Sequence, residues 1–72
     1  MTAKALIRIL LALGAEQLPR GATSHVRFRV GTYSTTVPVH AGEDLGAGLL
    51  RAIERDLEPC LGKKWLWKAR NR

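Results

Sequence analysis

The pattern that most restricts the fold is a pair of alternating stretches, residues 25–30 and 33–39, joined by Gly31-Thr32. Along each stretch every second side chain faces the same side of an extended strand, so that one face is mainly apolar. The residues of this face are Val26, Phe28 and Val30 in the first stretch, and Tyr33, Thr35, Val37 and Val39 in the second. Glycine at the first position of a two-residue connection favours a type II′ turn. The sequence therefore predicts an antiparallel hairpin whose apolar face must be covered by other elements.

A two-residue turn also fixes which residues of the hairpin lie opposite each other. It pairs Val30 with Tyr33, and it brings His25 opposite Pro38. The second face then carries the polar and basic side chains, namely His25, Arg27, Arg29, Thr36 and His40. In a regular ladder His25 and His40 are diagonal neighbours with backbones about 7–8 Å apart. Because proline has no backbone N–H to donate, Pro38 predicts that its strand end lies at a sheet edge.

Residues 2–14 have the pattern of a helix with Thr2 as its N-cap and Gly14 just past its end. The apolar residues that recur at helical spacing are Leu6, Ile9, Leu10 and Leu13. Lys4 and Arg8 mark the solvent side, although basic residues before an apolar run could also indicate a secretory signal peptide. We favour the helix for two reasons. Arg8 interrupts the apolar run, and removal of the whole segment as a signal peptide would take away the most apolar element of a small domain. The run is too short to cross a membrane, which requires about 20 apolar residues.

The rest of the chain predicts one more strand and one more helix. Residues 15–20 favour a short strand that Pro19 confines to an edge, and a loop follows at Gly21 to Ser24. After a glycine-rich connector from His40 to Gly48, a helical stripe consists of Leu49, Leu50, Ile53 and Leu57, and the opposite, solvent-facing side consists of Arg51, Glu54, Arg55 and Glu58. Pro59 is expected to end this helix. The order predicts an α+β fold, a three-stranded antiparallel sheet with two helices on its apolar face.

The length of 72 residues allows a single domain, which we divide into a core of about residues 2–58 and a basic tail, 59–72. The tail contains Trp65 and Trp67, which could stack on nucleic-acid bases or dock against the small core. The only cysteine, Cys60, excludes an internal disulfide and a cysteine-rich metal site. A small domain without disulfides is easiest to place in the reducing cytoplasm.

The charge indicates a negatively charged partner. Twelve Lys and Arg against six Asp and Glu give a formal net charge of +6. Eight of the twelve basic residues form two groups, Arg20, Arg27 and Arg29 in the first and Lys63, Lys64, Lys68, Arg70 and Arg72 in the second. Such groups are most simply explained by nucleic acid, although an acidic protein partner or a solvated basic surface would also account for them.

The side chains best suited to chemistry are His25 and His40, because histidine ordinarily exchanges a proton near neutral pH. A neutral imidazole can remove the proton of a ribose 2′-hydroxyl, whose oxygen then attacks the adjacent phosphorus while a cation stabilises the developing charge. DNA lacks this hydroxyl, so such a site would act on RNA. We expect no cofactor and no metal, since two histidines and one remote cysteine do not make a convincing zinc site. The alternative is that each histidine is only a surface residue.

Four segments between about Ala5 and Leu57 are informative as a set. They are Leu6-Ile7 through Leu13-Gly14, Ser24-His25-Val26-Arg27-Phe28, Thr36-Val37-Pro38-Val39-His40, and Gly48-Leu49-Leu50-Arg51 followed by Ile53. In this order the set resembles the HicA-type toxins, small mRNA interferases of bacterial toxin–antitoxin pairs. The sequence differs from the family pattern at Thr23, where glycine is usual, and in a slightly long segment that contains Pro19.

The resemblance implies a fold like that of the double-stranded-RNA-binding domain, α-β-β-β-α, with His25 as the catalytic residue. It also implies mRNA as the substrate and a HicB-type antitoxin protein as the partner that covers the site. We expect His25 to act as general base, with His40 or Ser24 in a possible supporting role. The residues expected to bind RNA are Arg27, Arg29, Arg20, Lys63 and Lys64. The rival hypotheses are a non-catalytic RNA-binding module and an inactive relative that acts only through its protein partner.

Overall fold

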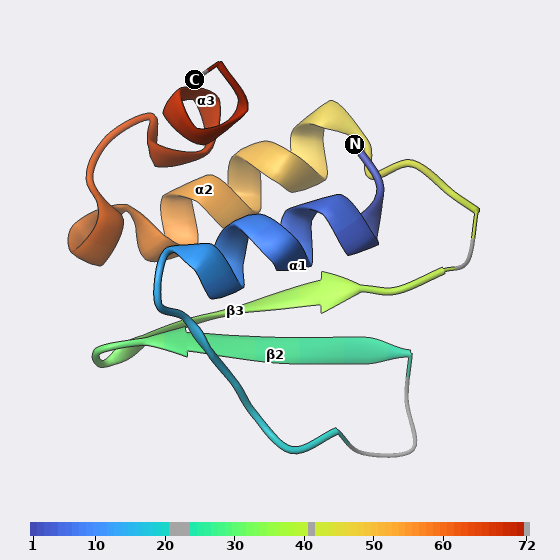
Figure 1. The fold of residues 1–72 in the computed structure, drawn as a ribbon, viewed down its shortest axis with the longest axis horizontal. Helices are drawn as coiled ribbons and strands as arrows, with labels where there is room; N and C mark the ends of the chain where they lie inside the picture. Colours follow the sequence, from blue (N-terminus) through green and yellow to red (C-terminus); the bar gives the residue numbers. More distant parts are fainter. Residues whose placement is uncertain (21–23, 41, 72) are drawn as a thin grey trace.

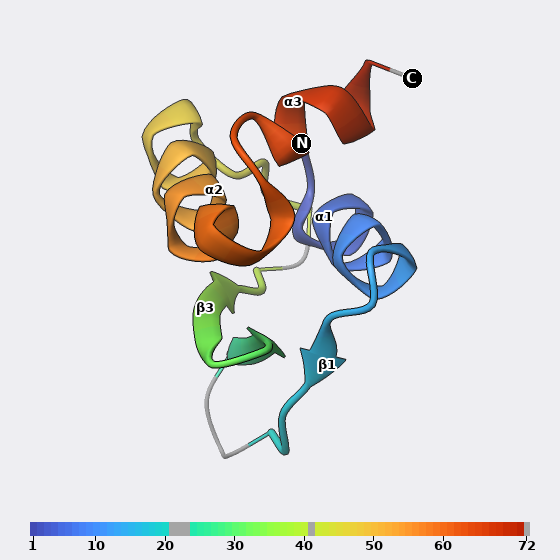
Figure 2. The same ribbon diagram turned by 90° about the vertical axis from the view of Figure 1, so that its left-hand side faces the viewer.

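The computed structural model describes residues 1–20, 24–40 and 42–71. Its elements follow in the order α1 (Ala3–Ala12), β1 (Glu16–Gln17), β2 (His25–Val30), β3 (Tyr33–Pro38), α2 (Ala47–Leu61) and α3 (Trp65–Arg70). The strands form one antiparallel sheet in the order β1-β2-β3, and the three helices lie on the same side of it (Figures 1 and 2). The predicted α+β fold is confirmed. The predictions for residues 21–23, which include Thr23, and for Ala41 and Arg72 fall outside the described residues.

Both predicted ends of α1 are confirmed. The Thr2 side chain accepts a hydrogen bond from the backbone N–H of Ala5 at 3.2 Å, as an N-cap residue does. At the other end Gly14 has φ +90, a conformation that residues with a Cβ rarely adopt, and the next N–H, that of Ala15, bonds to the Leu10 carbonyl at 2.9 Å. The second of these caps, at Gly14, fixes the direction in which the chain leaves the helix toward the sheet.

The apolar stripe of α1 is shorter than the sequence predicted. Leu6 and Leu10 are completely buried, whereas Leu13 is 40% exposed. The prediction for Leu13 was wrong because the helix ends at Ala12 and Leu13 is its C-cap residue, so it leaves the helical spacing that would carry it onto the buried face. The solvent side is confirmed, since Lys4 and Arg8 are exposed.

The predicted hairpin register is confirmed along β2 and β3. Val30 lies opposite Tyr33, and His25 lies opposite Pro38. The turn residue Gly31 has φ +61, while Thr32 does not have a positive φ, which is the combination of a type II′ turn. The inner face is formed by the buried side chains Val26, Phe28, Thr35 and Val37. Pro38 ends an edge strand, as expected.

The sheet departs from the expected pattern in two places, at the turn of the hairpin and along the edge strand β1. Tyr33 was predicted to face inward but is 44% exposed, because its partner Val30 is only half-buried and the covered face ends before the turn. The edge strand β1 comprises only Glu16–Gln17, and one further backbone bond follows it, from the Leu18 N–H to the Arg27 carbonyl. Pro19 has no N–H with which to extend this pairing.

The second helix does not end at Pro59, which contradicts the sequence prediction. The helix α2 continues to Leu61 with Pro59 inside its last turn. The proline removes one hydrogen bond of the helix, but neighbouring contacts hold the turn in place. The Cys60 thiol donates to the Val30 carbonyl at 3.2 Å, and the Gly62 N–H bonds to the Glu58 carbonyl at 2.8 Å. Tertiary packing therefore outweighs the local preference.

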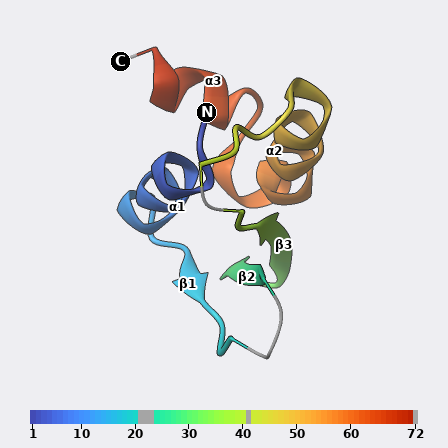
Figure 3. The same ribbon diagram turned by 90° about the vertical axis from the view of Figure 1, so that its right-hand side faces the viewer.

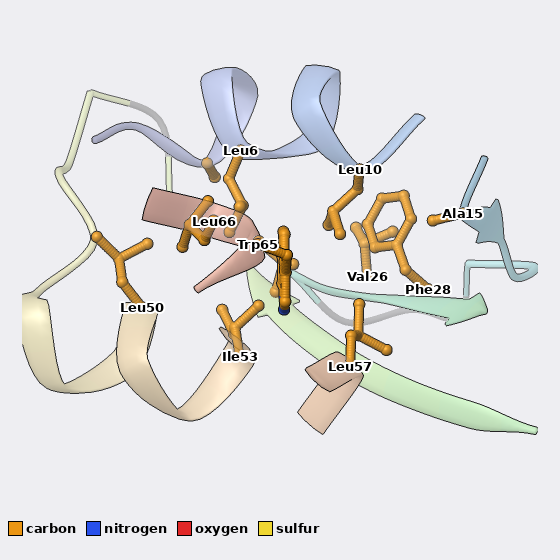
Figure 4. Close-up of a cluster of buried hydrophobic side chains, with 12 residues drawn as sticks. Leu6, Leu10, Ala15, Val26, Phe28, Leu50, Ile53, Leu57, Trp65 and Leu66 are labelled. Atoms are coloured by element: carbon orange, nitrogen blue, oxygen red, sulfur yellow. The ribbon is translucent and has the colours of Figure 1, made fainter. Parts of the chain in front are cut away.

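The tail forms a helix, α3, that packs onto the rest of the molecule. Trp65 and Leu66 are 4% and 3% exposed, and Figure 4 shows them among the core side chains of α1 and α2. The indole N–H of Trp65 donates to the Glu54 carbonyl at 2.7 Å. The Glu54 carboxylate in turn accepts the backbone N–H groups of Leu66 and Trp67, each at 3.2 Å. The prediction that Glu54 only faces water was wrong, because its side chain anchors α3.

Candidate nucleic-acid interface

The outer sheet face is the surface of β2 and β3 turned away from the helices, and it consists of His25, Arg27, Arg29, Ser34 and Thr36. Figures 2 and 3 view the strands from their two ends, with the three helices above them. Because side chains alternate along a strand, burial of Val26 and Phe28 turns the residues between them outward. The same alternation that builds the core therefore exposes a row of polar and basic groups.

His25 lies at the start of β2 and is exposed. Its backbone is held in the ladder opposite Pro38. The residue before it, Ser24, accepts a hydrogen bond from the Val39 N–H at 2.8 Å, so the pairing continues beyond the strand end. The imidazole is thus attached to a part of the backbone that is fixed on both sides. An exposed group on a fixed backbone is the arrangement that a reactive side chain requires.

The two arginines of this face have different partners. Arg27 donates from Nη2 to the Ser34 hydroxyl at 3.0 Å. No carboxylate of the described residues forms an ion pair with it. Arg29 instead pairs with Glu16, with 2.6 Å between Nη2 and Oε1. Arg27 therefore offers an uncompensated positive charge two residues from His25, whereas the charge of Arg29 is partly offset.

The Arg29–Glu16 pair links β2 to the short strand β1, because these two residues lie opposite each other in the ladder. Their side chains are 49% and 61% exposed. An exposed ion pair of this kind contributes at most about 1 kcal/mol, so an incoming phosphate can compete for the guanidinium. The sequence did not identify Glu16 as a partner because the register of β1 was not predicted. Ser34 was not named either, although the hairpin register places it opposite Arg29 and diagonal to Arg27.

His40 lies in a different environment from His25. It follows the end of β3 by two residues and lines a pocket with Thr2 and Val39, beside the start of α1. Its carbonyl accepts the Glu43 N–H at 3.1 Å, which closes the turn after the strand. The regular ladder stops before His40, so the diagonal relation to His25 stays a prediction.

The predicted RNA-binding residues are divided between two surfaces. Arg27 and Arg29 belong to the outer sheet face, whereas Lys63 and Lys64 lie in the connection between α2 and α3, on the helical side (Figure 1). These lysines line a pocket with Arg51, Arg55, Glu54 and Glu58 of α2. Arg20 is exposed beyond β1. The fold therefore does not gather the whole predicted set around His25.

Within residues 1–20, 24–40 and 42–71, no three His, Cys, Asp or Glu side chains are grouped so that they could hold a metal ion. In the same part of the chain, none of the helices has both the length and the apolar character needed to cross a membrane.

The chain matches a protein-family model over most of its length. Residues 3–58 match the model described as the HicA toxin of bacterial toxin–antitoxin systems. The matched segment contains α1, the three strands and α2 up to the residue before Pro59, which is more than half of the chain. Neither the curated proteins nor the solved structures contain a significant match.

Proposed function

The chain belongs to the HicA toxin family, and we propose on this basis that it is the toxin of a bacterial toxin–antitoxin pair and cleaves mRNA. The observation that carries the proposal is the exposure of His25 on the same sheet face as Arg27, within the segment that matches the family. An imidazole beside a guanidinium suits an RNA phosphodiester, because one group takes a proton and the other attracts the phosphate. The proposed setting is the cytoplasm, where mRNA is available.

The proposed reaction begins at a ribose 2′-hydroxyl. Neutral His25 accepts the hydroxyl proton, and the 2′-oxygen attacks the adjacent phosphorus. A new bond forms between phosphorus and the 2′-oxygen, and the bond to the 5′-oxygen of the next nucleotide breaks. The products are a strand ending in a 2′,3′-cyclic phosphate and a strand with a free 5′-hydroxyl. None of these steps requires a metal ion or a cofactor.

Arg27 has the proposed role of binding the phosphate that is attacked. Negative charge grows on the non-bridging oxygens during the attack, and a nearby guanidinium stabilises it. The bond from Arg27 to Ser34 holds the side chain along the outer sheet face, which limits the number of conformations it must give up on binding. Arg29 and Arg20 have a secondary role as phosphate contacts at the β1 edge. Ser24 is a further supporting candidate, since it is exposed next to His25.

The leaving 5′-oxygen must receive a proton, and His40 is the candidate for this step. His40 follows the end of β3 and lines a pocket beside the start of α1, whereas His25 lies in the ladder on the outer sheet face. A water molecule or the His25 imidazolium can protonate the same oxygen. The role of His40 is therefore the part of the mechanism that mutation tests most directly.

The proposed partner is a HicB-type antitoxin, which inhibits the toxin by covering the outer sheet face. That face is turned away from the chain's own helices (Figures 2 and 3), and His25 and Arg27 are exposed. A protein bound there would exclude RNA from the imidazole. This inhibition explains how a bacterium could produce the chain without arresting its own growth.

The deciding experiment compares the wild type with His25→Ala and with His40→Ala, which makes the same chemical change at the other histidine. Each purified protein is incubated with single-stranded RNA in the presence of a chelator, and each gene is expressed to measure growth arrest. We expect His25→Ala to reduce cleavage by about 10²–10⁴-fold, the usual contribution of a general base. The wild-type products should carry 2′,3′-cyclic phosphate ends. RNA methylated at every 2′-oxygen should remain intact.

The rival hypotheses give different results in the same experiment. A non-catalytic RNA-binding module would bind RNA in a salt-sensitive manner as the wild type and as either histidine variant, and even the wild type would not cut it. An inactive relative that acts through its partner would show neither cleavage nor growth arrest. Cleavage that survives in a folded His25→Ala protein would disprove the assigned general base. Folding of each variant is checked by circular dichroism.

A further inference from the structure

The aromatic residue Trp67 is exposed although the two residues before it are buried. Trp67 is 60% exposed, whereas Trp65 and Leu66, immediately before it on α3, are almost completely buried. Its backbone N–H is bonded to the Glu54 carboxylate, so its position on α3 is anchored to α2. A tryptophan that is mostly open to water is unusual, because its large apolar area ordinarily favours burial. The exposed indole therefore needs an explanation other than packing.

Trp67 lies in a groove between α2 and α3, which we call the Trp67 groove. Its lining includes Leu50, Arg51, Glu54, Leu66, Trp67 and Arg70. The floor contains two buried leucines, and the polar part contains two guanidinium groups from different helices. The one carboxylate, Glu54, already accepts two backbone N–H groups of α3, which offset its negative charge. The groove thus combines an aromatic face with positive charge.

The charge of the surrounding segment is positive throughout. The sequence from Pro59 to Arg72 contains no Asp or Glu. Lys68 and Arg70 on α3 are exposed, as are Lys63 and Lys64 just before it. The family match ends at residue 58, so the family model does not account for α3. A basic segment with one exposed aromatic is the composition of a single-stranded nucleic-acid contact, in which bases stack and cations bind phosphates.

We infer that the Trp67 groove is an accessory binding site for single-stranded RNA, with a base stacked on the Trp67 indole and phosphates bound by Arg51 and Arg70. The inference rests on the proposed function, in which RNA is the substrate. The groove belongs to the helical layer, whereas His25 lies on the outer sheet face. A contact on this separate surface adds affinity for the strand and does not take part in the chemistry. An acidic protein segment is the competing occupant, and the experiment below separates the two.

The experiment measures binding of an oligouridylate to the full chain carrying His25→Ala, which prevents cleavage during the measurement. Fluorescence anisotropy of the labelled oligonucleotide gives the dissociation constant. We expect Trp67→Ala to weaken binding about tenfold, from the loss of one stacked base, and Trp67→Phe to recover most of the affinity. Tyr33→Ala is the matched control, because it removes another exposed aromatic remote from α3, and it should change little. Replacing Arg51 or Arg70 by Gln should reduce the salt dependence by roughly one ion each.

Cleavage by the chain with His25 intact gives an independent measurement. Trp67→Ala should raise KM and leave kcat unchanged. If the chain binds RNA through Trp67 but does not cut it, the proposed nuclease is wrong while the accessory site stands. If the chain cuts RNA and Trp67→Ala binds it as tightly as before, the accessory site is wrong. Unchanged RNA affinity together with weaker binding of the antitoxin would also overturn it and would identify the groove as a protein interface.

Discussion

The outer sheet face and the Trp67 groove are both exposed and basic, but they are built in different ways. The sheet face results from alternation within two neighbouring strands, so each of its groups is positioned by residues close to it in sequence. The groove joins Arg51 of α2 to Trp67 and Arg70 of α3, and it exists only while α3 is docked. The sheet face should therefore persist when distant contacts are removed, and the groove should not. The predictions below test this difference, beginning with the largest effect.

The strongest test removes the side chain that docks α3. Trp65→Ala deletes a buried indole and its hydrogen bond to the Glu54 carbonyl, so we expect a loss of about 3–5 kcal/mol in the free energy of unfolding. Urea denaturation measures the change. Trp67→Ala is the matched control and should alter stability by less than about 0.5 kcal/mol, because its side chain is largely exposed. Equal losses for the two variants would contradict the assignment of Trp65 to the core.

A more selective change removes only the anchor of α3. Glu54→Ala leaves the N–H groups of Leu66 and Trp67 without the carboxylate that accepts them. A hydrogen bond to a charged group contributes about 1.5–3 kcal/mol to stability, and a donor left unpaired adds a further cost. We expect faster hydrogen exchange at these two amides and unchanged exchange in β2 and β3. If the strands lose protection to the same extent, the two regions are not independent and the comparison fails.

The corresponding local change in the sheet is at the hairpin turn. Gly31 has φ +61, and a Cβ added there would lie 3.2 Å from the Cys60 sulfur, so Gly31→Ala should cost about 1–2 kcal/mol. Unlike the Glu54 variant, it should affect exchange first at the turn and in the last turn of α2. A neutral result would show that the turn adapts its backbone without strain. Cys60→Ala tests the sulfur contact separately.

The smallest expected effect distinguishes the two arginines of the outer sheet face. Arg27→Gln should weaken RNA binding several-fold and lower its salt dependence by roughly one ion, because this guanidinium has no carboxylate partner among the described residues. Arg29→Gln should have a weaker effect, since its charge is already partly offset by Glu16. Filter binding at several salt concentrations measures both. The reverse order would show that the Glu16 pair opens readily when RNA binds.

The features predicted from sequence are those determined by neighbouring residues. Alternation and a glycine turn were sufficient to predict the full register from His25–Pro38 to Val30–Tyr33, and cap residues predicted both ends of α1. The register in turn predicted the outward direction of His25 and Arg27. These are local consequences of backbone geometry, which a single sequence contains.

The features that sequence did not predict depend on contacts between distant residues. The helix continues through Pro59, and in the turn that follows this proline Cys60 bonds to Val30, thirty residues earlier in the chain. The carboxylate of Glu54 accepts two backbone N–H groups of α3, twelve and thirteen residues later, so its helical position alone could not show its role. The Arg29–Glu16 pair likewise depends on the pairing of β1. A rule based on spacing has no means of detecting these contacts.

The docking of Trp65 and Leu66 has a consequence for any attempt to shorten this chain. The segment that matches the family, residues 3–58, ends before both of these side chains, yet they share one apolar cluster with Leu6, Leu50 and Ile53. A fragment that ends at residue 58 would therefore expose apolar core side chains to water and would tend to aggregate. If such a fragment fails to arrest growth, misfolding is a sufficient explanation. Toxicity should therefore be measured with all 72 residues present.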